Sequence, residues 1–140
     1  MDCPSPLLRP LSRQVWVTGQ LTSGQVSAVR EQGFTCLVNH RPDGEEPGQP
    51  SAAEIAHAAA EARIRVVHAP VRGLPDPAAV AATRAVLDSL GADDRAVFFC
   101  RSGMRSAAAW AMAERLAGAD PQALRRAALS AGYDLGGVPL

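Results

Sequence analysis

The chain has 140 residues, a length that suits one domain with a single hydrophobic core. Its 14 basic and 14 acidic residues cancel, so the sequence has no excess charge for binding nucleic acid or an anionic membrane. No apolar run approaches the roughly 18 residues of a membrane span, and the proline-containing N-terminus, with an acid at its second residue, does not resemble a signal peptide. We therefore expect a cytoplasmic protein with no nucleic-acid or membrane partner.

Strand and helix patterns alternate along the chain after an irregular arm over residues 1–13, so we expect a single domain over residues 14–140. Helix starts are marked by Ser, Thr or Asp caps, twice with proline at the first helical position. The predicted strands are Gln14–Gly19, Thr35–His40, Arg65–Val71 and Ala96–Cys100. The predicted helices cover residues 22–33, 51–64, 77–90, 106–118 and 121–131.

The order βαβαβαβαα indicates an α/β fold, with a four-stranded, mostly parallel sheet and helices on both faces. In such sheets ligands bind beyond the carboxyl ends of the strands. Three loops follow predicted strands: residues 41–50 (RPDGEEPGQP), 72–76 (RGLPD) and 101–106 (RSGMRS). We expect all three loops to lie at one edge of the sheet and to form the functional site there.

The segment AVFFCRSGMRS places Cys100 where a buried strand meets a helix. Gly103 permits a tight turn, and the N–H groups of a helix start, together with Arg101 and Arg105, favour negative charge at one spot. Each of these features favours a thiolate nucleophile over an inert core thiol. We therefore expect Cys100 and Arg105 to be catalytic. The anion-binding loop would contain Arg101, Ser102, Gly103, Met104 and Ser106.

The other two cysteines contrast with Cys100. Cys36 lies inside the strand TCLVNH, with no glycine or arginine after it, and is expected to pack in the core. Cys3 lies in the arm, where we expect no role. An odd number of cysteines without CxxC spacing argues against a disulfide framework or a structural zinc site. We expect reduced thiols, no metal and no cofactor.

The segments VNHRPDGEEPGQPSAAEI, CRSGMRSAAAWAMA and ALSAGYDL resemble a bacterial family of small domains, "beta-lactamase hydrolase-like protein, phosphatase-like domain". The resemblance runs from about Gln14 to Leu135. It implies a fold like that of the cysteine-dependent phosphatases, with Cys100 as nucleophile. Members also occur fused to sulfide-oxidising metallo-hydrolases, which implies sulfur metabolism and a sulfide-oxidising enzyme as a partner acting in trans.

The length of the cysteine loop bears on whether the substrate is a phosphate or a sulfur compound. Protein tyrosine phosphatases carry H-C-x5-R, and their arginine clamps phosphate with two hydrogen bonds. In this chain Ser106 occupies that arginine position, Arg105 comes one residue earlier, and Phe99 replaces the histidine. The shorter spacing resembles single-domain rhodaneses, whose loop carries a persulfide, so it favours sulfur transfer.

A phosphatase also needs a general acid to protonate its leaving group. The loop after the third strand offers only Asp76, which precedes Pro77 and an apolar-periodic helix, so a helix cap is its simpler role. The loop after the second strand is expected to line the site, with its acids bracing Arg101 or Arg105; a solvated turn is the alternative. Its candidate residues are His40, Arg41, Asp43, Glu45 and Glu46.

From the sequence we expect a sulfurtransferase that acts on a small anionic substrate. Cys100 would form a persulfide from a donor such as thiosulfate or glutathione persulfide and pass the sulfur to a thiol or to cyanide. One alternative is a phosphatase-like hydrolase that forms a phosphocysteine from a phosphoester. A second alternative is a non-catalytic module that binds anions or phosphoproteins.

Overall fold

A computed structural model of the chain describes residues 5–140. Part of the expected arm, including Cys3, therefore lies outside the described residues. The strands are β1 (Arg9–Pro10), β2 (Val15–Thr18), β3 (Cys36–Asn39), β4 (Arg65–His68) and β5 (Ala96–Phe99). The helices are α1 (Ser23–Glu31), α2 (Ala52–Ala62), α3 (Pro77–Ser89), α4 (Met104–Leu116) and α5 (Pro121–Ser130).

The sheet has the strand order β1-β2-β5-β3-β4, and only β1 runs antiparallel to its neighbour. The predicted α/β fold is confirmed, but the predicted count of four strands is wrong by one. The extra strand is Arg9–Pro10, which lies inside the arm expected to be irregular. Arg9 pairs with Val17 and Pro10 with Trp16 of β2. Two residues show no alternating pattern, and proline is confined to sheet edges, so the sequence carried no signal for this strand.

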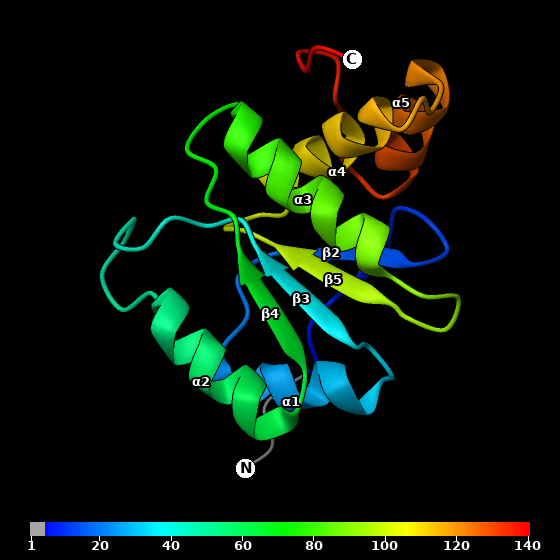
Figure 1. The fold of residues 1–140 in the computed structure, drawn as a ribbon. Helices are drawn as coiled ribbons and strands as arrows, with labels where there is room; N and C mark the ends of the chain where they lie inside the picture. Colours follow the sequence, from blue (N-terminus) through cyan, green and yellow to red (C-terminus); the bar gives the residue numbers. More distant parts are fainter. Residues whose placement is uncertain (1–4) are drawn as a thin grey trace.

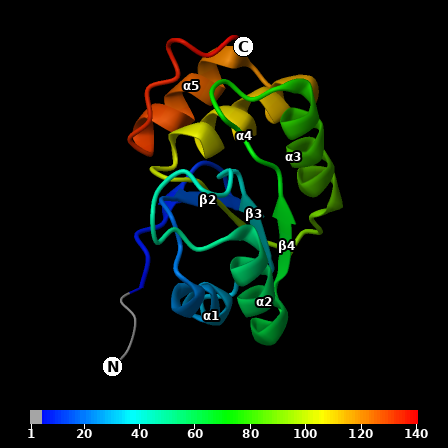
Figure 2. The ribbon, with the colours of Figure 1, turned by 90° about the vertical axis from the view of Figure 1, so that its left-hand side faces the viewer.

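Helices cover both faces of the sheet. Helices α1 and α2 pack side by side on one face, whereas α3, α4 and α5 cover the other (Figures 1 and 2). Four of the helices begin at a cap whose side chain accepts a backbone N–H three residues later, as the sequence predicted. The caps are Thr22, Ser51, Asp76 and Asp120. Helix α4 has no such side-chain cap and begins at Gly103, in the cysteine loop.

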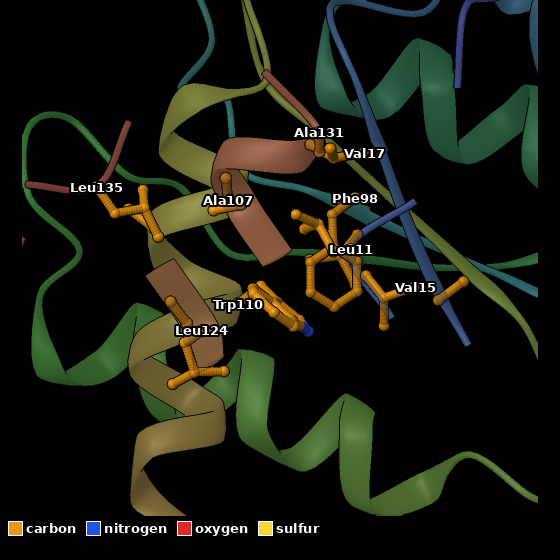
Figure 3. Packing of buried hydrophobic residues seen from close by; sticks show 14 of the residues in the cluster. Leu11, Val15, Val17, Phe98, Ala107, Trp110, Leu124, Ala131 and Leu135 are labelled. Atoms are coloured by element: carbon orange, nitrogen blue, oxygen red, sulfur yellow. The ribbon is translucent and has the colours of Figure 1, made fainter. Parts of the chain in front are cut away.

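Strand β5 is buried in the middle of the sheet and contributes to the core on both faces. Phe98 packs with Val17 and Trp110 beneath α4 and α5 (Figure 3). Phe99 points to the opposite face, into the cluster under α1 and α2 with Leu37. Because successive strand residues alternate between faces, both cores fix β5, and with it the backbone that carries Cys100.

The carboxyl ends of the parallel strands coincide. Phe99 at the end of β5 lies in register with Thr18 of β2 and Asn39 of β3. The segments that follow β2, β3, β4 and β5 therefore meet at one edge, as expected from the strand order. Of the helices in residues 5–140, none has the length and apolar character needed to cross a membrane.

Candidate active site

Cys100 directly follows β5 at the carboxyl edge of the sheet and is fully buried. Its Sγ accepts a hydrogen bond from the backbone N–H of Gly103 at 3.1 Å. Gly103 has a φ of +99°, which L side chains rarely adopt, and a Cβ added there would lie 2.2 Å from the Tyr133 hydroxyl. Glycine is thus required both by the turn that aims an N–H at the sulfur and by the side chain packed over it.

The cysteine loop is held by segments from both ends of the chain. The backbone N–H of Gln20, just after β2, donates to the Arg101 carbonyl at 3.2 Å. The Tyr133 hydroxyl, from the segment after α5, donates to the Ser102 carbonyl at 3.0 Å. These bonds fix the loop backbone while the side chains of Arg101 and Ser102 stay exposed.

Arg105 lies in the first turn of α4 and makes a two-pronged ion pair with Glu45. Its Nη1 and Nη2 donate to the two carboxylate oxygens at 2.8 Å each, and Nη1 also donates to the Val71 carbonyl at 2.7 Å. The pKa of Arg105 is raised, chiefly by the hydrogen bonds to Glu45, and negative charge at Cys100 raises it further. The guanidinium therefore lies close enough to Cys100 for the two groups to interact.

Arg41 ties the loop after β3 to this site. Its side chain is 1% exposed, with Nε 2.9 Å from Glu45 Oε1, Nη2 2.9 Å from Glu46 Oε1 and Nη1 3.1 Å from Gln20 Oε1. Glu45 thus bridges Arg41 and Arg105, and its hydrogen bond from Arg105 is the largest cause of a pKa lowered to about 2. Glu45 is ionised at neutral pH and cannot donate a proton as a general acid.

Glu46 makes a weaker link to the cysteine loop. Its Oε2 lies 3.7 Å from Nη2 of the exposed Arg101, and its pKa is lowered, chiefly by the hydrogen bond from Arg41. Of the acids expected to brace Arg101 or Arg105, Glu45 thus lies beside Arg105 and Glu46 beside Arg101. Asp43 does not take part, because its Oδ1 accepts the N–H of Ala52 at 2.7 Å at the start of α2.

His40 and Ser106 lie beneath the site and are fully buried. Thr83 donates its only hydroxyl proton to the Ala79 carbonyl at 2.8 Å, so at 2.9 Å it accepts the Nε2–H of His40. The Nδ1 of His40 then accepts the hydroxyl proton of Ser106 at 2.8 Å. The pKa of His40 is lowered to about 3, chiefly by burial, so the ring is neutral. Its two hydrogen bonds connect the end of β3 to α3 and α4.

In residues 5–140 no described hydrogen bond joins the remaining predicted residues to the Cys100 sulfur. Asp76 caps α3 by accepting the N–H of Ala79 at 2.8 Å, as the simpler of its two expected roles required. In residues 5–140 neither Asp76 nor Asp43 hydrogen-bonds to the cysteine loop. Met104 is half-buried and packs against the core beneath α4 and α5. Ser106 also faces this interior, so its hydroxyl is not part of an anion-binding surface.

Several contributors were not singled out from the sequence, namely Gln20, Thr83, Tyr133 and the carbonyl of Val71. Tyr133 lies in ALSAGYDL, one of the three segments that carried the family resemblance, but nothing local shows that its hydroxyl reaches Ser102. Each of these groups lies more than thirty residues from its partner at the site, except where Gln20 meets Arg41 at a separation of 21. Local patterns do not reveal such pairs.

The arrangement can bind an anion beside a thiolate. Gly103 supplies a backbone donor at the sulfur, and Arg105 supplies a planar cation that now holds a carboxylate. Cys36 and Cys100 are both unpaired thiols. Within the described part of the chain, no three His, Cys, Asp or Glu side chains are grouped so that they could hold a metal ion.

Solved structures share this fold. A candidate phosphatase from Neisseria meningitidis Z2491 superposes with a TM-score of 0.78 at 24% identity, over 92% of this chain and 91% of the other. A kinase-associated phosphatase, studied with serine in place of its catalytic cysteine, superposes with a TM-score of 0.75 at 13% identity, over 94% and 86%. At these identities the likeness shows a cysteine-phosphatase-like fold and no more.

Sequence comparison gives the family. A beta-lactamase hydrolase-like protein of Agrobacterium fabrum (strain C58 / ATCC 33970) is 30% identical over 109 residues, which are 77% of this chain but 25% of the relative. The chain thus spans about a quarter of that relative's length. Residues 7–119 match the family described as "Beta-lactamase hydrolase-like protein, phosphatase-like domain". The expected family is confirmed, and the chain belongs to it.

Proposed function

We propose that this chain is a cysteine-dependent, phosphatase-like hydrolase of small anionic phosphoesters, with Cys100 as the nucleophile. The observation that carries the proposal is the position of the Cys100 sulfur, which receives the Gly103 N–H at 3.1 Å with the Arg105 guanidinium close by. The phosphatase-like family and the shared fold support this chemistry over the sulfur transfer that the loop spacing favoured.

The reaction has two displacements at phosphorus. The Cys100 thiolate attacks, an S–P bond forms and the P–O bond to the leaving group breaks, which gives a phosphocysteine. Water then attacks phosphorus, the S–P bond breaks, and phosphate and the thiolate are released. Arg105 binds the phosphoryl oxygens in both steps, and for this it must exchange the Glu45 carboxylate for substrate.

Proton supply limits the substrates. Glu45 is ionised, Asp76 and Asp43 accept N–H groups at the starts of α3 and α2, and His40 is buried and neutral. None of these four groups is placed to protonate a leaving oxygen beside Cys100, so in this proposal the proton comes from water. A general acid contributes roughly 10²–10⁴-fold, mainly for poor leaving groups. We therefore propose that the enzyme prefers leaving groups that are stable as anions.

Sulfur transfer is the second candidate, and the same missing acid supports it, together with the five-residue step from Cys100 to Arg105. The thiolate would attack the outer sulfur of thiosulfate, the S–S bond would break, and sulfite would leave with the bonding electrons without needing a proton. An acceptor thiolate or cyanide would then remove the sulfur from the persulfide and regenerate the Cys100 thiolate.

Intact-mass spectrometry distinguishes phosphoester hydrolysis from sulfur transfer. The protein is mixed with 4-nitrophenyl phosphate or with thiosulfate, quenched in acid and weighed, with Cys36→Ser and Cys100→Ser as matched variants. We expect a gain of one phosphoryl group in the wild type and in Cys36→Ser, and none in Cys100→Ser. A gain of one sulfur from thiosulfate alone would replace the phosphatase proposal by sulfur transfer. If neither adduct forms and there is no turnover, only the anion-binding alternative remains.

A further inference from the structure

A cavity of about 370 Å³ lies beside the cysteine loop, on the side of β1 and β2. Its volume is in the range of small-molecule sites. Arg9 and Thr18 line it from the paired strands, Ser102 from the cysteine loop and Tyr133 from the segment after α5. On the β3 side of the loop, the Arg105 guanidinium that would bind the phosphoryl group is paired with Glu45. A substrate held at Cys100 therefore has room for its remaining part on the β1–β2 side.

Tyr133 connects this cavity to the reactive sulfur. It lines the cavity, its hydroxyl donates to the Ser102 carbonyl at 3.0 Å, and the same hydroxyl lies over Gly103. Burial raises the pKa of Tyr133, and the charge of Arg9 opposes this shift while negative charge at Cys100 adds to it. The hydroxyl is thus near enough to interact electrostatically with both Arg9 and Cys100.

Arg9 gives the cavity a positive charge. Its single described hydrogen bond is long, 3.4 Å from Nη1 to the Ala131 carbonyl. Within residues 5–140 no carboxylate pairs with Arg9, in contrast to Arg41 and Arg105, which share Glu45. The hydroxyl of Thr18 donates to the Leu7 carbonyl and adds no negative charge. An anion in this cavity would therefore meet an uncompensated guanidinium.

We propose that this cavity is a leaving-group subsite, in which Arg9 selects substrates whose leaving group carries an anionic substituent of its own. The inference rests on the proposed function, and it fits the missing general acid, because Arg9 binds the departing anion without a proton transfer. A carboxylate or second phosphoryl group on a small leaving group has the required charge, and Arg9 can bind either with two hydrogen bonds.

Binding of the free leaving group tests the subsite without turnover. The probes are 5-hydroxy-2-nitrobenzoate and 4-nitrophenol, which differ by one carboxylate, titrated calorimetrically with inorganic phosphate in excess to occupy the Cys100 loop. We expect the carboxylated probe to bind at least about tenfold more tightly. Arg9→Gln should abolish this preference and Arg9→Lys should retain part of it. Arg13→Gln, which removes an exposed arginine outside the cavity, should leave it unchanged.

Turnover of the matching phosphate esters gives the second readout. The ratio of kcat/KM for the carboxylated over the plain nitrophenyl ester should fall to about one in Arg9→Gln, whereas Arg13→Gln should keep the wild-type ratio. Equal binding of the two probes by the wild type, or a preference that survives Arg9→Gln, overturns the subsite. If neither ester is hydrolysed while the Arg9-dependent binding persists, the proposed hydrolase function fails and the anion subsite stands.

Discussion

Cys36 is the first residue of β3 and Cys100 directly follows the neighbouring parallel strand β5, so the two buried thiols lie at the amino edge and the carboxyl edge of the sheet. At the amino edge, the Cys36 thiol points to the Leu37 carbonyl at 3.7 Å, and its pKa is raised, chiefly by burial. At the carboxyl edge, the Cys100 sulfur instead accepts the Gly103 N–H. Burial is common to both thiols; the difference is whether an acceptor or a donor faces the sulfur.

Charged groups act on the thiols at both edges. At the amino edge, burial raises the pKa of Cys36 most, the charge of Arg65 opposes this shift and that of Asp94 adds to it. At the amino edge Asp94 accepts the Gly91 N–H at 2.7 Å and the Thr35 hydroxyl at 3.0 Å, and Arg95 stacks over Phe34. These contacts close a turn. At the carboxyl edge the polar groups converge because parallel strands end together and α4 begins there, where the first N–H groups of a helix have no partner within the helix itself. The candidate nucleophile is therefore distinguished by the N–H donor that points at its sulfur, rather than by burial or by nearby charge.

Replacing each cysteine by serine is the strongest way to break this comparison. Cys100→Ser should reduce turnover by at least about 10³-fold, because it removes the attacking sulfur. Cys36→Ser should keep the turnover of the folded enzyme and lower its unfolding free energy by about 1–3 kcal/mol, since it buries a hydroxyl in an apolar core. Urea unfolding and steady-state kinetics measure the two effects. Equal losses of turnover in both variants would contradict the assignment.

Arginine substitutions sharpen the contrast between the edges. Arg105→Lys should lose nearly as much turnover as Arg105→Ala, about 10²-fold, because lysine keeps the charge and loses the planar fork. Arg95→Ala, at the amino edge, should change only stability, through the lost contact with Phe34 and Trp16. Near wild-type kcat/KM in Arg105→Lys would show that charge alone suffices at the carboxyl edge.

Acid sensitivity should originate at the carboxyl edge, in two overlapping pH windows. His40 has its pKa lowered from 6.5 to about 3, so the unfolded chain binds the extra proton and stability falls as pH drops below 6.5. The slope cannot exceed about 1.4 kcal/mol per pH unit for one proton. Glu45 has its pKa lowered from 4.5 to about 2, so its contribution is lost below pH 4.5.

Urea unfolding of single variants measures these windows. His40→Gln should flatten the dependence of unfolding free energy on pH between 6.5 and 4.5. Glu45→Gln should leave that range unchanged and reduce the slope below 4.5, where His40 still contributes down to about 3. An unchanged slope in His40→Gln between pH 6.5 and 4.5 would show that the buried ring is not the proton-linked group.

The smallest expected effect concerns Asp76, a helix cap at the carboxyl edge. Asp76→Ala should cost about 1 kcal/mol of stability, and Asp76→Asn much less, because asparagine also caps helices. Asp120→Ala removes the matching cap of α5 and should cost a similar amount. Turnover should be unaffected in all three. A large loss of kcat in Asp76→Asn with an unaltered Tm would instead make Asp76 the general acid.

The sequence by itself determined the helix caps, the buried strands and the place of Cys100 between a strand and a helix, because hydrophobic periodicity and cap chemistry act over a few neighbouring residues. The family followed from three such segments. The local sequence did not predict β1, which forms because Arg9–Pro10 pairs with β2.

Only the tertiary structure decided which partners surround the sulfur. Glu45 reaches Arg105 across 60 residues, and Ser106 reaches His40 across 66. Tyr133 reaches Ser102 only because the segment after α5 returns to the cysteine loop. These contacts, like the cavity beside Arg9, depend on the strand order that brings distant loops to one edge. No local sequence pattern predicts these contacts, because the same residue types also occur in exposed turns that make no long-range contact.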